Sequence, residues 1–381
     1  MPKQPSCRWV TALAVVVLLA GCPTPPQDLD EFLSATMDQA RVPGLAACIV
    51  KDGAVVWSGV YGWADAAART PVTADTHFML ASVSKTITAT ALMQLYEAGR
   101  FRLDDNVNAF LPFVVENPHH AASPLTFRML LTHTSSIQDN YAVLESLYVL
   151  GDSPIALGEF LREYLTPDGR YYDRTNSYYR YAPGERWNYS NVGMTLAGYL
   201  VEVISGVPFD QYCEENIFGP LGMTEAAWFL AGLEGARVAR PHQYDWLRRE
   251  YVPLDHYGYP DYPDGQLRAS ARAYARLLAV FLGDGTVDNV RILAPETVTE
   301  MLSIPFPDVR PDQAHAWFYA NADGSPSFGH SGGDQGVTTD VFFVPDEGIG
   351  VVVLTNGEIP LLRGGLLESM GNRLLDEARA L

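Results

Sequence analysis

Positive charge is scarce in this chain of 381 residues, which carries 26 lysines and arginines against 45 aspartates and glutamates. The net charge of −19 argues against nucleic acid or an anionic lipid surface as a partner, because both repel an acidic protein. Lysine is rarer still, since the chain contains only Lys3, Lys51 and Lys85. A lysine within a predicted helix of such an arginine-rich chain therefore needs a specific explanation.

Metal and cofactor signals are also missing from the sequence. No His-Glu-x-x-His motif or glycine-rich phosphate loop occurs, and His119 and His120 have no other ligands at a useful spacing. We therefore expect neither a metal nor a cofactor. Among the four cysteines, Cys48 lies in an apolar run and Cys213 in a predicted helix, so two buried free thiols are favoured over a disulfide.

Long apolar runs are limited to one near the start of the chain. Trp9 to Ala20 is apolar but too short to cross a bilayer as a helix, and Lys3 and Arg8 precede it. This order of charged, apolar and small residues is typical of a secretory signal. The run closes on Leu19-Ala20-Gly21-Cys22, which resembles the lipobox of bacterial lipoproteins.

The lipobox resemblance implies that residues 1–21 are removed and that Cys22 carries lipid. Residues 22–27, which are rich in proline, would then form a short stiff tether. The protein is thus expected to be exported and anchored by lipid to a membrane of the bacterial cell envelope. An uncleaved anchor helix is the alternative, and it also places the rest of the chain outside the cytoplasm.

Strand patterns occur at both ends of the remaining chain, with helical patterns between them. Alternating residues and turn signals predict strands at 45–50, 55–61, 315–320, 328–331, 337–344 and 348–354. Helices are predicted at 28–39, 83–98, 269–282 and 362–380. Residues 28–381 are therefore predicted to form one α+β domain: an antiparallel sheet flanked by N- and C-terminal helices, interrupted by a mostly helical insertion at about 100–265.

A candidate nucleophile lies at the start of the helix predicted at 83–98. Ser82 and Lys85 are three residues apart, so their side chains share one face of a helix. A lysine can activate a serine once its surroundings lower its pKa, whereas an arginine stays protonated. The other lysine of the globular part, Lys51, falls in a predicted hairpin turn, where we expect it to be solvated.

Gly329-His330-Ser331-Gly332-Gly333 offers a rival nucleophile, because it fits the Gly-x-Ser-x-Gly elbow of α/β-hydrolases. Such an elbow leads into a helix, yet the segment from Val337 to Val344 is strand-like. The histidine of the triad should also follow the serine, but His330 is the last histidine of the chain. Ser331 is therefore rejected as a nucleophile.

Three segments together resemble the serine β-lactamase and penicillin-binding-protein superfamily, in its branch of class C β-lactamases, DD-peptidases and carboxylesterases. Residues 77–89 resemble the nucleophile helix, and Tyr189-Ser190-Asn191 resembles the Tyr-x-Asn element. Residues 329–333 resemble the Lys-Thr-Gly strand, with His330 in the lysine position. A second Tyr-x-Asn, at residues 319–321, runs into Ala-Asp-Gly and is interpreted as part of a hairpin.

The resemblance implies roles for the matching residues. Ser82 would be the nucleophile, with Lys85 and Tyr189 as its proton-transfer partners. The backbone N–H groups of Ser82 and Gly333 would form the oxyanion hole. Substrate-binding residues would be Asn191, His330, Ser331 and Gly332.

His330 departs from the family pattern in a way that bears on the substrate. A lysine in that position offers a fixed positive charge to the carboxylate of a β-lactam or a D-Ala-D-Ala peptide, whereas histidine is mostly neutral at pH 7. A structural, hydrogen-bonded histidine is the alternative interpretation. We therefore expect a serine hydrolase that forms an acyl-enzyme on a small-molecule or peptide substrate. Three activities remain open: a β-lactamase or peptidase, a carboxylesterase, or a non-catalytic binding lipoprotein.

Overall fold

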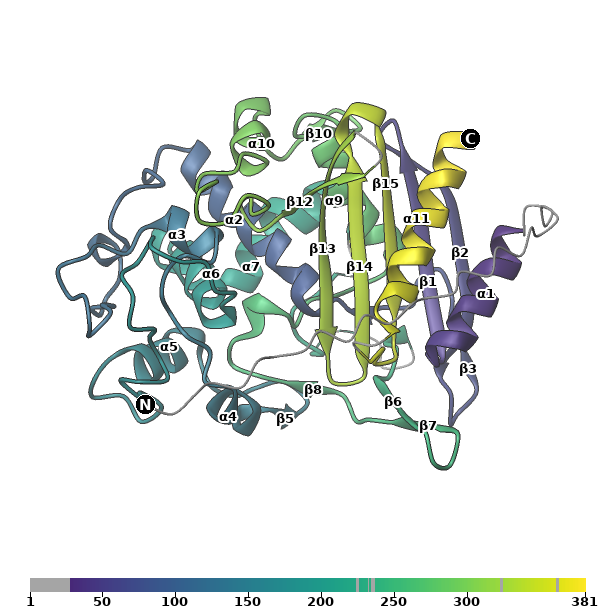
Figure 1. Ribbon diagram of the computed structural model, residues 1–381, viewed down its shortest axis with the longest axis horizontal. Coiled ribbons are helices and arrows are strands. Elements are labelled where there is room, and N and C mark those ends of the chain that lie inside the picture. The colour runs from purple at the N-terminus through teal and green to yellow at the C-terminus, as the bar shows by residue number, and fades with distance from the viewer. Residues whose placement is uncertain (1–27, 224–225, 232, 234–236, 323–324, 361–362) are drawn as a thin grey trace, which may run out of the picture.

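The computed structural model describes residues 28–381, apart from 224–225, 232, 234–236, 323–324 and 361–362 (Figure 1). The predicted signal peptide, the lipidation site Cys22 and the tether 22–27 therefore lie outside the described residues.

A seven-stranded antiparallel sheet forms the frame of the molecule. Its strands follow the order β12 (Phe318–Ala322), β13 (Ser325–Asp334), β14 (Val337–Val344), β15 (Ile349–Thr355), β1 (Gly44–Lys51), β2 (Ala54–Asp65) and β3 (Thr70–Pro71). The pairing of β1 with β15, in which Ala47 lies opposite Val353, joins the two ends of the chain. The sheet is therefore complete only when both ends are in place.

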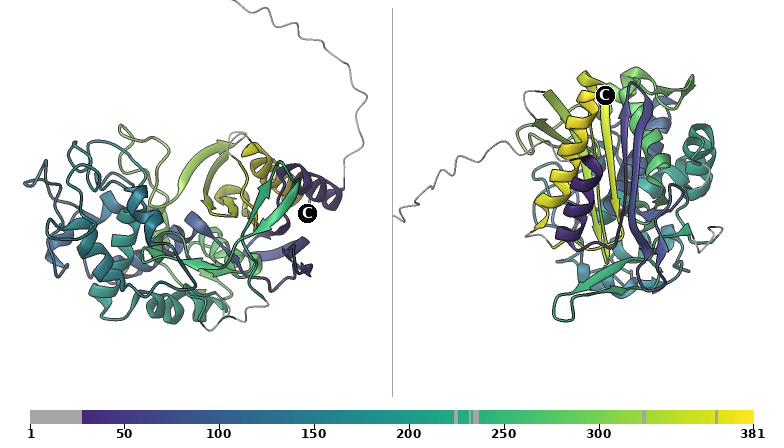
Figure 2. Two further views of the ribbon diagram at one scale, coloured as in Figure 1. Left: turned by 90° about the horizontal axis from the view of Figure 1, so that it is seen from below. Right: turned by 90° about the vertical axis from the view of Figure 1, so that its right-hand side faces the viewer.

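Helices cover both faces of this sheet, as the edge-on view in Figure 2 shows. The terminal helices α1 (Leu29–Ala40) and α11 (Gly365–Ala380) lie on one face. On the other face α9 (Ala271–Leu282) packs against β1 and β15, and α2 (Ser84–Glu97) lies behind it. Strand β1 is buried on both faces, which explains its continuous apolar sequence.

The region between α2 and α9 consists of short helices, small two-stranded ribbons and loops. Its helices are α3 (Phe127–Leu131), α4 (Tyr141–Leu144), α5 (Leu157–Leu165), α6 (Asn191–Ser205), α7 (Phe209–Cys213) and α8 (Gly219–Leu221), and α10 (Pro295–Met301) follows α9. The ribbons within this region pair β5 (Val149–Leu150) with β8 (Tyr257–Gly258), and β6 (His242–Asp245) with β7 (Glu250–Pro253). Two further ribbons involve strands outside it: β4 (Phe78–Met79), before α2, pairs with β9 (Arg268–Ala269), and β10 (Thr286–Val287) pairs with β11 (Val290–Arg291) after α9. The predicted α+β fold class is confirmed.

Local details differ from the sequence predictions at three places. Helix α2 begins at Ser84, because Ser82 lies in a preceding 3-10 turn, η1 (Ala81–Val83). The strand predicted from residue 315 begins only at Phe318, because Ala316 has a φ of 58°, which interrupts an extended backbone. Lys51 is not simply solvated, since its Nζ donates a hydrogen bond of 3.0 Å to the carbonyl of Ala378 at the end of α11.

The two thiols and the longest apolar helices are accounted for within the described residues. Cys48 and Cys213 are both buried and free, as predicted. No single described helix is long and apolar enough to cross a membrane, and Asn191–Ser205 with Phe209–Leu221 passes such a test only as a bent pair.

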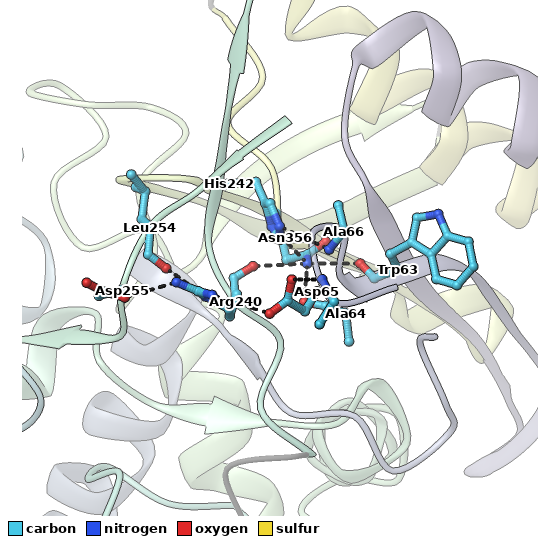
Figure 3. Close-up of polar contacts among 10 residues, drawn as sticks. Trp63, Ala64, Asp65, Ala66, Arg240, His242, Leu254, Asp255 and Asn356 are labelled. Atoms are coloured by element: carbon cyan, nitrogen blue, oxygen red, sulfur yellow. Dashed lines mark hydrogen bonds and ion pairs between the residues drawn. The ribbon is translucent and has the colours of Figure 1, made fainter. Parts of the chain in front are cut away.

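A buried cluster of hydrogen bonds around Asn356, at the end of β15, connects three parts of the chain (Figure 3). The side-chain amide of Asn356 donates to the carbonyl oxygens of Trp63 (3.1 Å), Ala64 (2.9 Å) and Arg240 (3.0 Å). The same nitrogen lies 3.3 Å from Nδ1 of His242, which is fully buried. One side chain thus satisfies carbonyl groups of β2 and of the segment that enters β6.

Replacing Asn356 by alanine should therefore destabilise the protein. Buried carbonyl groups would lose their donor, and we expect the free energy of unfolding to fall by about 3 kcal/mol. Urea denaturation followed by tryptophan fluorescence measures this change. Asn372→Ala, at an exposed position of α11, is the matched control and should leave the midpoint nearly unchanged. Equal midpoints for both variants would contradict the stabilising role of the Asn356 hydrogen bonds.

Candidate active site

Ser82 is held at the edge of a cavity by a tightly fixed turn. The preceding residue, Ala81, is buried and has a φ of 48°, in the left-handed region that non-glycine residues rarely adopt. Leu80 is fixed from two sides, because its N–H donates to the carbonyl of Leu267 (2.8 Å) and its carbonyl accepts from Thr339 Oγ1 (2.7 Å). The turn presents the partly exposed Ser82 side chain to the cavity.

Lys85 lies one turn further along, in the first turn of α2, and it is fully buried. Its Nζ donates hydrogen bonds to Ser82 Oγ (3.0 Å) and to the carbonyl oxygen of Asp264 (2.7 Å). The spacing of three residues therefore brings the hydroxyl and the amine together, as the sequence predicts.

The electrostatics of Lys85 differ from the expectation of a lowered pKa. Burial disfavours the ammonium form, but the oxygens of Tyr189 and the carboxylates of Asp264 and Asp139 outweigh burial and raise the pKa of Lys85. Lys85 is thus an ammonium group in the empty site. It can act as a base only together with a neighbour that takes or releases a proton.

Tyr189 is that neighbour. Its ring centroid lies 5.0 Å from Lys85 Nζ, and its buried hydroxyl interacts with Ser82 and Lys85. Burial raises the pKa of Tyr189, and the ammonium of Lys85 opposes this shift. The ring of His133 packs against Tyr189 with centroids 4.2 Å apart, and His133 Nδ1 accepts the N–H of Ser190 at 3.2 Å.

Asp139 is a positioning residue that sequence reasoning missed. Its carboxylate accepts hydrogen bonds from the N–H groups of Asn191 (2.7 Å) and Val192 (3.1 Å) and from the hydroxyl of Ser190 (3.1 Å). These contacts cap the N-terminus of α6 and fix the segment that carries Tyr189. No motif marks Asp139, because it lies 52 residues from Asn191 and acts through backbone groups.

His330 lies on the inner face of β13 and is buried, with an exposed fraction of 3%. Its Nδ1 lies 2.7 Å from the carbonyl oxygen of Ser331, and its Nε2 has no partner among the described residues. Burial, assisted by the positive charge of Lys85, lowers the pKa of His330 to about 3. The ring is therefore neutral at physiological pH, in agreement with the low charge expected from the sequence.

The other predicted residues of β13 divide between the two faces of the strand. Gly332 lies against the nucleophile, since a Cβ atom there would come within 2.5 Å of the Leu80 carbonyl oxygen and 3.1 Å of Ser82 N. Gly333 lines the same cavity as Ser82, and a Cβ atom there would meet nothing within 4 Å. Ser331 is exposed and lines a separate groove beside α11, so the structure does not bring its side chain to Ser82.

The cavity at Ser82 has a volume of about 330 Å³. Its wall contains four aromatic side chains, Tyr141, Tyr148, Tyr189 and Tyr259. The ring of Tyr148 stacks on that of Tyr259 at a centroid distance of 4.7 Å. Aromatic rings from residues 141–148 and from Tyr259 therefore line the cavity together with Tyr189.

Metal-binding groups do not gather in this part of the protein. Across the described residues no three His, Cys, Asp or Glu side chains are placed so that they could hold a metal ion.

Residues 29–366 match the family model described as Beta-lactamase, and the chain belongs to this family. Its function is of the serine-hydrolase kind. The predicted superfamily is therefore confirmed.

Penicillin-binding proteins and an esterase are among its relatives. The chain is 27% identical to penicillin-binding protein 4 of Amycolatopsis lactamdurans, over 86% of this chain and 84% of that protein. It is 32% identical to esterase EstB of Burkholderia gladioli, over 56% of this chain and 54% of the esterase. An octameric penicillin-binding-protein homologue from Pyrococcus abyssi has a similar structure, with a TM-score of 0.71, 25% identity and coverage of 91% and 77%.

Coverage is lower for another relative. An uncharacterized protein of Mycobacterium tuberculosis is 29% identical over 63% of this chain, and the chain spans only 62% of its length.

The low pKa of His330 generates a prediction about stability. Between pH 6.5 and about 3 the unfolded chain binds a proton at His330 and the native protein does not. The contribution of neutral His330 to the free energy of unfolding is fully present above pH 6.5. It is lost as the pH falls, by at most about 1.4 kcal/mol per pH unit.

His330→Asn should therefore flatten the decline of the free energy of unfolding between pH 6.5 and 4, which urea titrations at a series of pH values measure. Parallel declines in the variant and the wild type would contradict the assignment.

Proposed function

We propose that this protein hydrolyses ester or amide bonds through an acyl-enzyme on Ser82. The observation that carries the proposal is the 3.0 Å hydrogen bond between Ser82 Oγ and the fully buried Lys85, at the edge of a cavity. A lysine on the solvent-exposed face of a helix would not be buried with its amine against a serine hydroxyl and a backbone carbonyl. The buried hydroxyl of Tyr189, which interacts with Ser82 and Lys85, supports the same conclusion.

Lys85 and Tyr189 would act as one proton-transfer unit. A neutral amine with a phenol and an ammonium with a phenolate have the same net charge, so the two forms exchange without a change in the charge of the site. In either form the pair has lost one proton relative to the empty site, and it can accept the proton of Ser82. The pKa values of both groups are raised, so this form is favoured by alkaline pH.

The reaction would proceed in two stages, acylation of Ser82 and hydrolysis of the acyl-enzyme. Ser82 Oγ attacks the substrate carbonyl carbon, its proton passes to the Lys85–Tyr189 pair, and the oxyanion is held by the N–H groups of Ser82 and Gly333. The pair then protonates the departing alcohol or amine as its bond to the carbonyl carbon breaks. Water attacks the acyl-enzyme by the reverse route, which releases the acid and restores Ser82.

Small esters and peptide-like amides are favoured over β-lactams as substrates. His330 is neutral, with a pKa of about 3, and therefore offers no fixed charge to a substrate carboxylate. The similarity to an esterase supports this choice, and the similarity to penicillin-binding proteins keeps peptides of the cell-envelope type within the proposal. Asn191, whose Oδ1 is buried without a partner among the described residues, is the proposed contact for a substrate amide.

The alternative function is that of a binding protein that is acylated but does not turn over. No described contact favours it, and the intact Ser82, Lys85 and Tyr189 favour hydrolysis. Incubation with nitrocefin and with D-alanyl peptides separates the alternatives, because a binder gains the mass of the acyl group and keeps it.

Removing the nucleophile provides the direct test of hydrolysis. Ser82→Ala should lower kcat/KM for p-nitrophenyl butyrate by about 10⁴-fold, because the acyl-enzyme can no longer form. Initial rates and intact-protein mass spectrometry measure the effect. Ser369→Ala, which removes a hydroxyl from α11, serves as the matched control and should retain wild-type rates. Equal rates for Ser82→Ala and wild type would refute the mechanism.

We also propose that the protein works in the bacterial cell envelope, anchored by lipid on Cys22. The support is the segment Leu19-Ala20-Gly21-Cys22 after the apolar run. Cys22→Ser should move the protein from the membrane fraction to the soluble fraction of an expressing bacterium and abolish incorporation of labelled palmitate. Cys7→Ser, within the predicted signal, is the matched control and should remain membrane-bound. Retention of label by Cys22→Ser would contradict lipidation at this residue.

A further inference from the structure

Carboxyl groups dominate the polar part of the cavity wall at Ser82. Glu145, Asp261, Asp264 and Asp334 all line it, and no lysine, arginine or histidine does so among the described residues. The nearest ammonium, that of Lys85, is already hydrogen-bonded to Ser82 and to the Asp264 carbonyl. An anionic substrate would therefore meet carboxyl groups without a free cation to pair with.

One of these carboxyl groups has an unused acceptor. Asp261 lines the cavity and is 3% exposed, and its Oδ1 is buried without a hydrogen bond from an amide, hydroxyl or charged donor among the described residues. Its carboxyl group interacts with that of Asp264. A buried acceptor of this kind costs free energy until a donor reaches it. Asp264, three residues further along the same loop, is also buried, at 6% exposed. Any ligand that satisfies Asp261 must bring an N–H or O–H donor into the cavity.

The paired carboxyl groups favour a positively charged donor over a neutral one. Burial, followed by the neighbouring carboxylate of Asp264, raises the pKa of Asp261 well above its usual value. Burial also raises the pKa of Asp264, to about 7. The empty pair therefore retains a proton, and an ammonium ligand would replace that proton while it satisfies Asp261 Oδ1.

Asp334 is fixed at the opposite side of the site, next to Gly333. Its carboxylate accepts hydrogen bonds from the hydroxyls of Tyr148 (3.2 Å) and Tyr259 (3.1 Å). Burial raises the pKa of Asp334, and these hydroxyl groups oppose that shift while they hold the carboxyl group in place. Carboxyl groups therefore border the site from the sheet as well as from the loop that carries Asp261. The exposed side chain of Glu145, which forms no hydrogen bond or ion pair among the described residues, adds charge at the mouth.

We propose that the cavity selects substrates with an ammonium group in the acyl part, such as aminoacyl esters, aminoacyl amides and peptides with a free amino group, and that Asp261 is the residue that receives this group. The proposal rests on hydrolysis at Ser82 and specifies the substrate class of that site. Asn191 and Asp261 line the same cavity, so one acyl group can reach both.

Three p-nitrophenyl esters of one chain length test the proposal on the full chain. Butyryl is neutral, 3-aminopropanoyl replaces the terminal methyl by an ammonium, and succinyl ends in a carboxylate. We expect kcat/KM for the 3-aminopropanoyl ester to exceed that for the butyryl ester by about tenfold or more, and the succinyl ester to be the poorest substrate. The rate with Ser82→Ala is subtracted, because it reports uncatalysed hydrolysis.

Variants that replace a carboxyl group by an amide test whether the cavity wall causes the preference for the 3-aminopropanoyl ester. Asp261→Asn should reduce the ratio of the 3-aminopropanoyl rate to the butyryl rate to about one, since an amide cannot release a proton and become the anion that pairs with an ammonium. Glu145→Gln, at an exposed position that folding does not need, should reduce the ratio by about twofold. Asp376→Asn on α11 is the matched control for net charge and should leave the ratio unchanged.

The outcomes separate this proposal from the proposed function. Hydrolysis of all three esters at similar rates, or preference for succinyl, overturns the ammonium proposal and leaves the serine hydrolase intact. A preference that survives in both Asp261→Asn and Glu145→Gln overturns the role of the wall. Absence of Ser82-dependent hydrolysis of any ester overturns the proposed function itself.

Discussion

The buried ammonium group of Lys85 is the constraint on which the active site depends. A charge removed from water costs several kcal/mol unless its surroundings replace the lost hydration. Ser82 Oγ, the Asp264 carbonyl and the ring of Tyr189 provide that replacement, and they come from the turn before α2, the loop before α9 and the segment before α6. The helical region must therefore close over α2 before Lys85 can be accommodated. Folding of the insertion and assembly of the catalytic group are the same event.

Local patterns predicted the parts of the fold and site that depend on neighbours in sequence. The spacing of Ser82 and Lys85 brings them together because residues three apart lie on one side of a helical turn. The strands with alternating residues and the antiparallel sheet that they form were also predicted from the sequence. The position of Ser331 could have been predicted as well, since successive strand residues face opposite sides and His330 faces inward. The family motif favoured placing both in the site, but the period of the strand decides where each side chain lies.

Contacts between distant segments could not be predicted from the sequence. Asp139 caps α6 across 52 residues, and Asp264 reaches Lys85 across 179. Neither contact leaves a periodic or compositional trace, because a backbone group is one of the partners in each. The same limit explains the error about the pKa of Lys85. Burial alone lowers it, and only the positions of Tyr189 and the acidic residues show that the opposite effect is larger.

The neutral histidine on β13 and the carboxyl groups of the cavity wall both disfavour an anionic substrate. His330 removes a positive charge from the strand that borders the cavity, and Asp334, four residues later on that strand, adds a carboxyl group whose pKa is raised by burial. Asp261 and Asp264 place two further carboxyl groups on the cavity wall. A site of this kind keeps a complete acyl-transfer apparatus, because Ser82, Lys85 and Tyr189 depend on one another and not on the charge of the substrate. Nucleophile chemistry and substrate charge are therefore set by separate residues, so the family fold can retain the first while the second reverses.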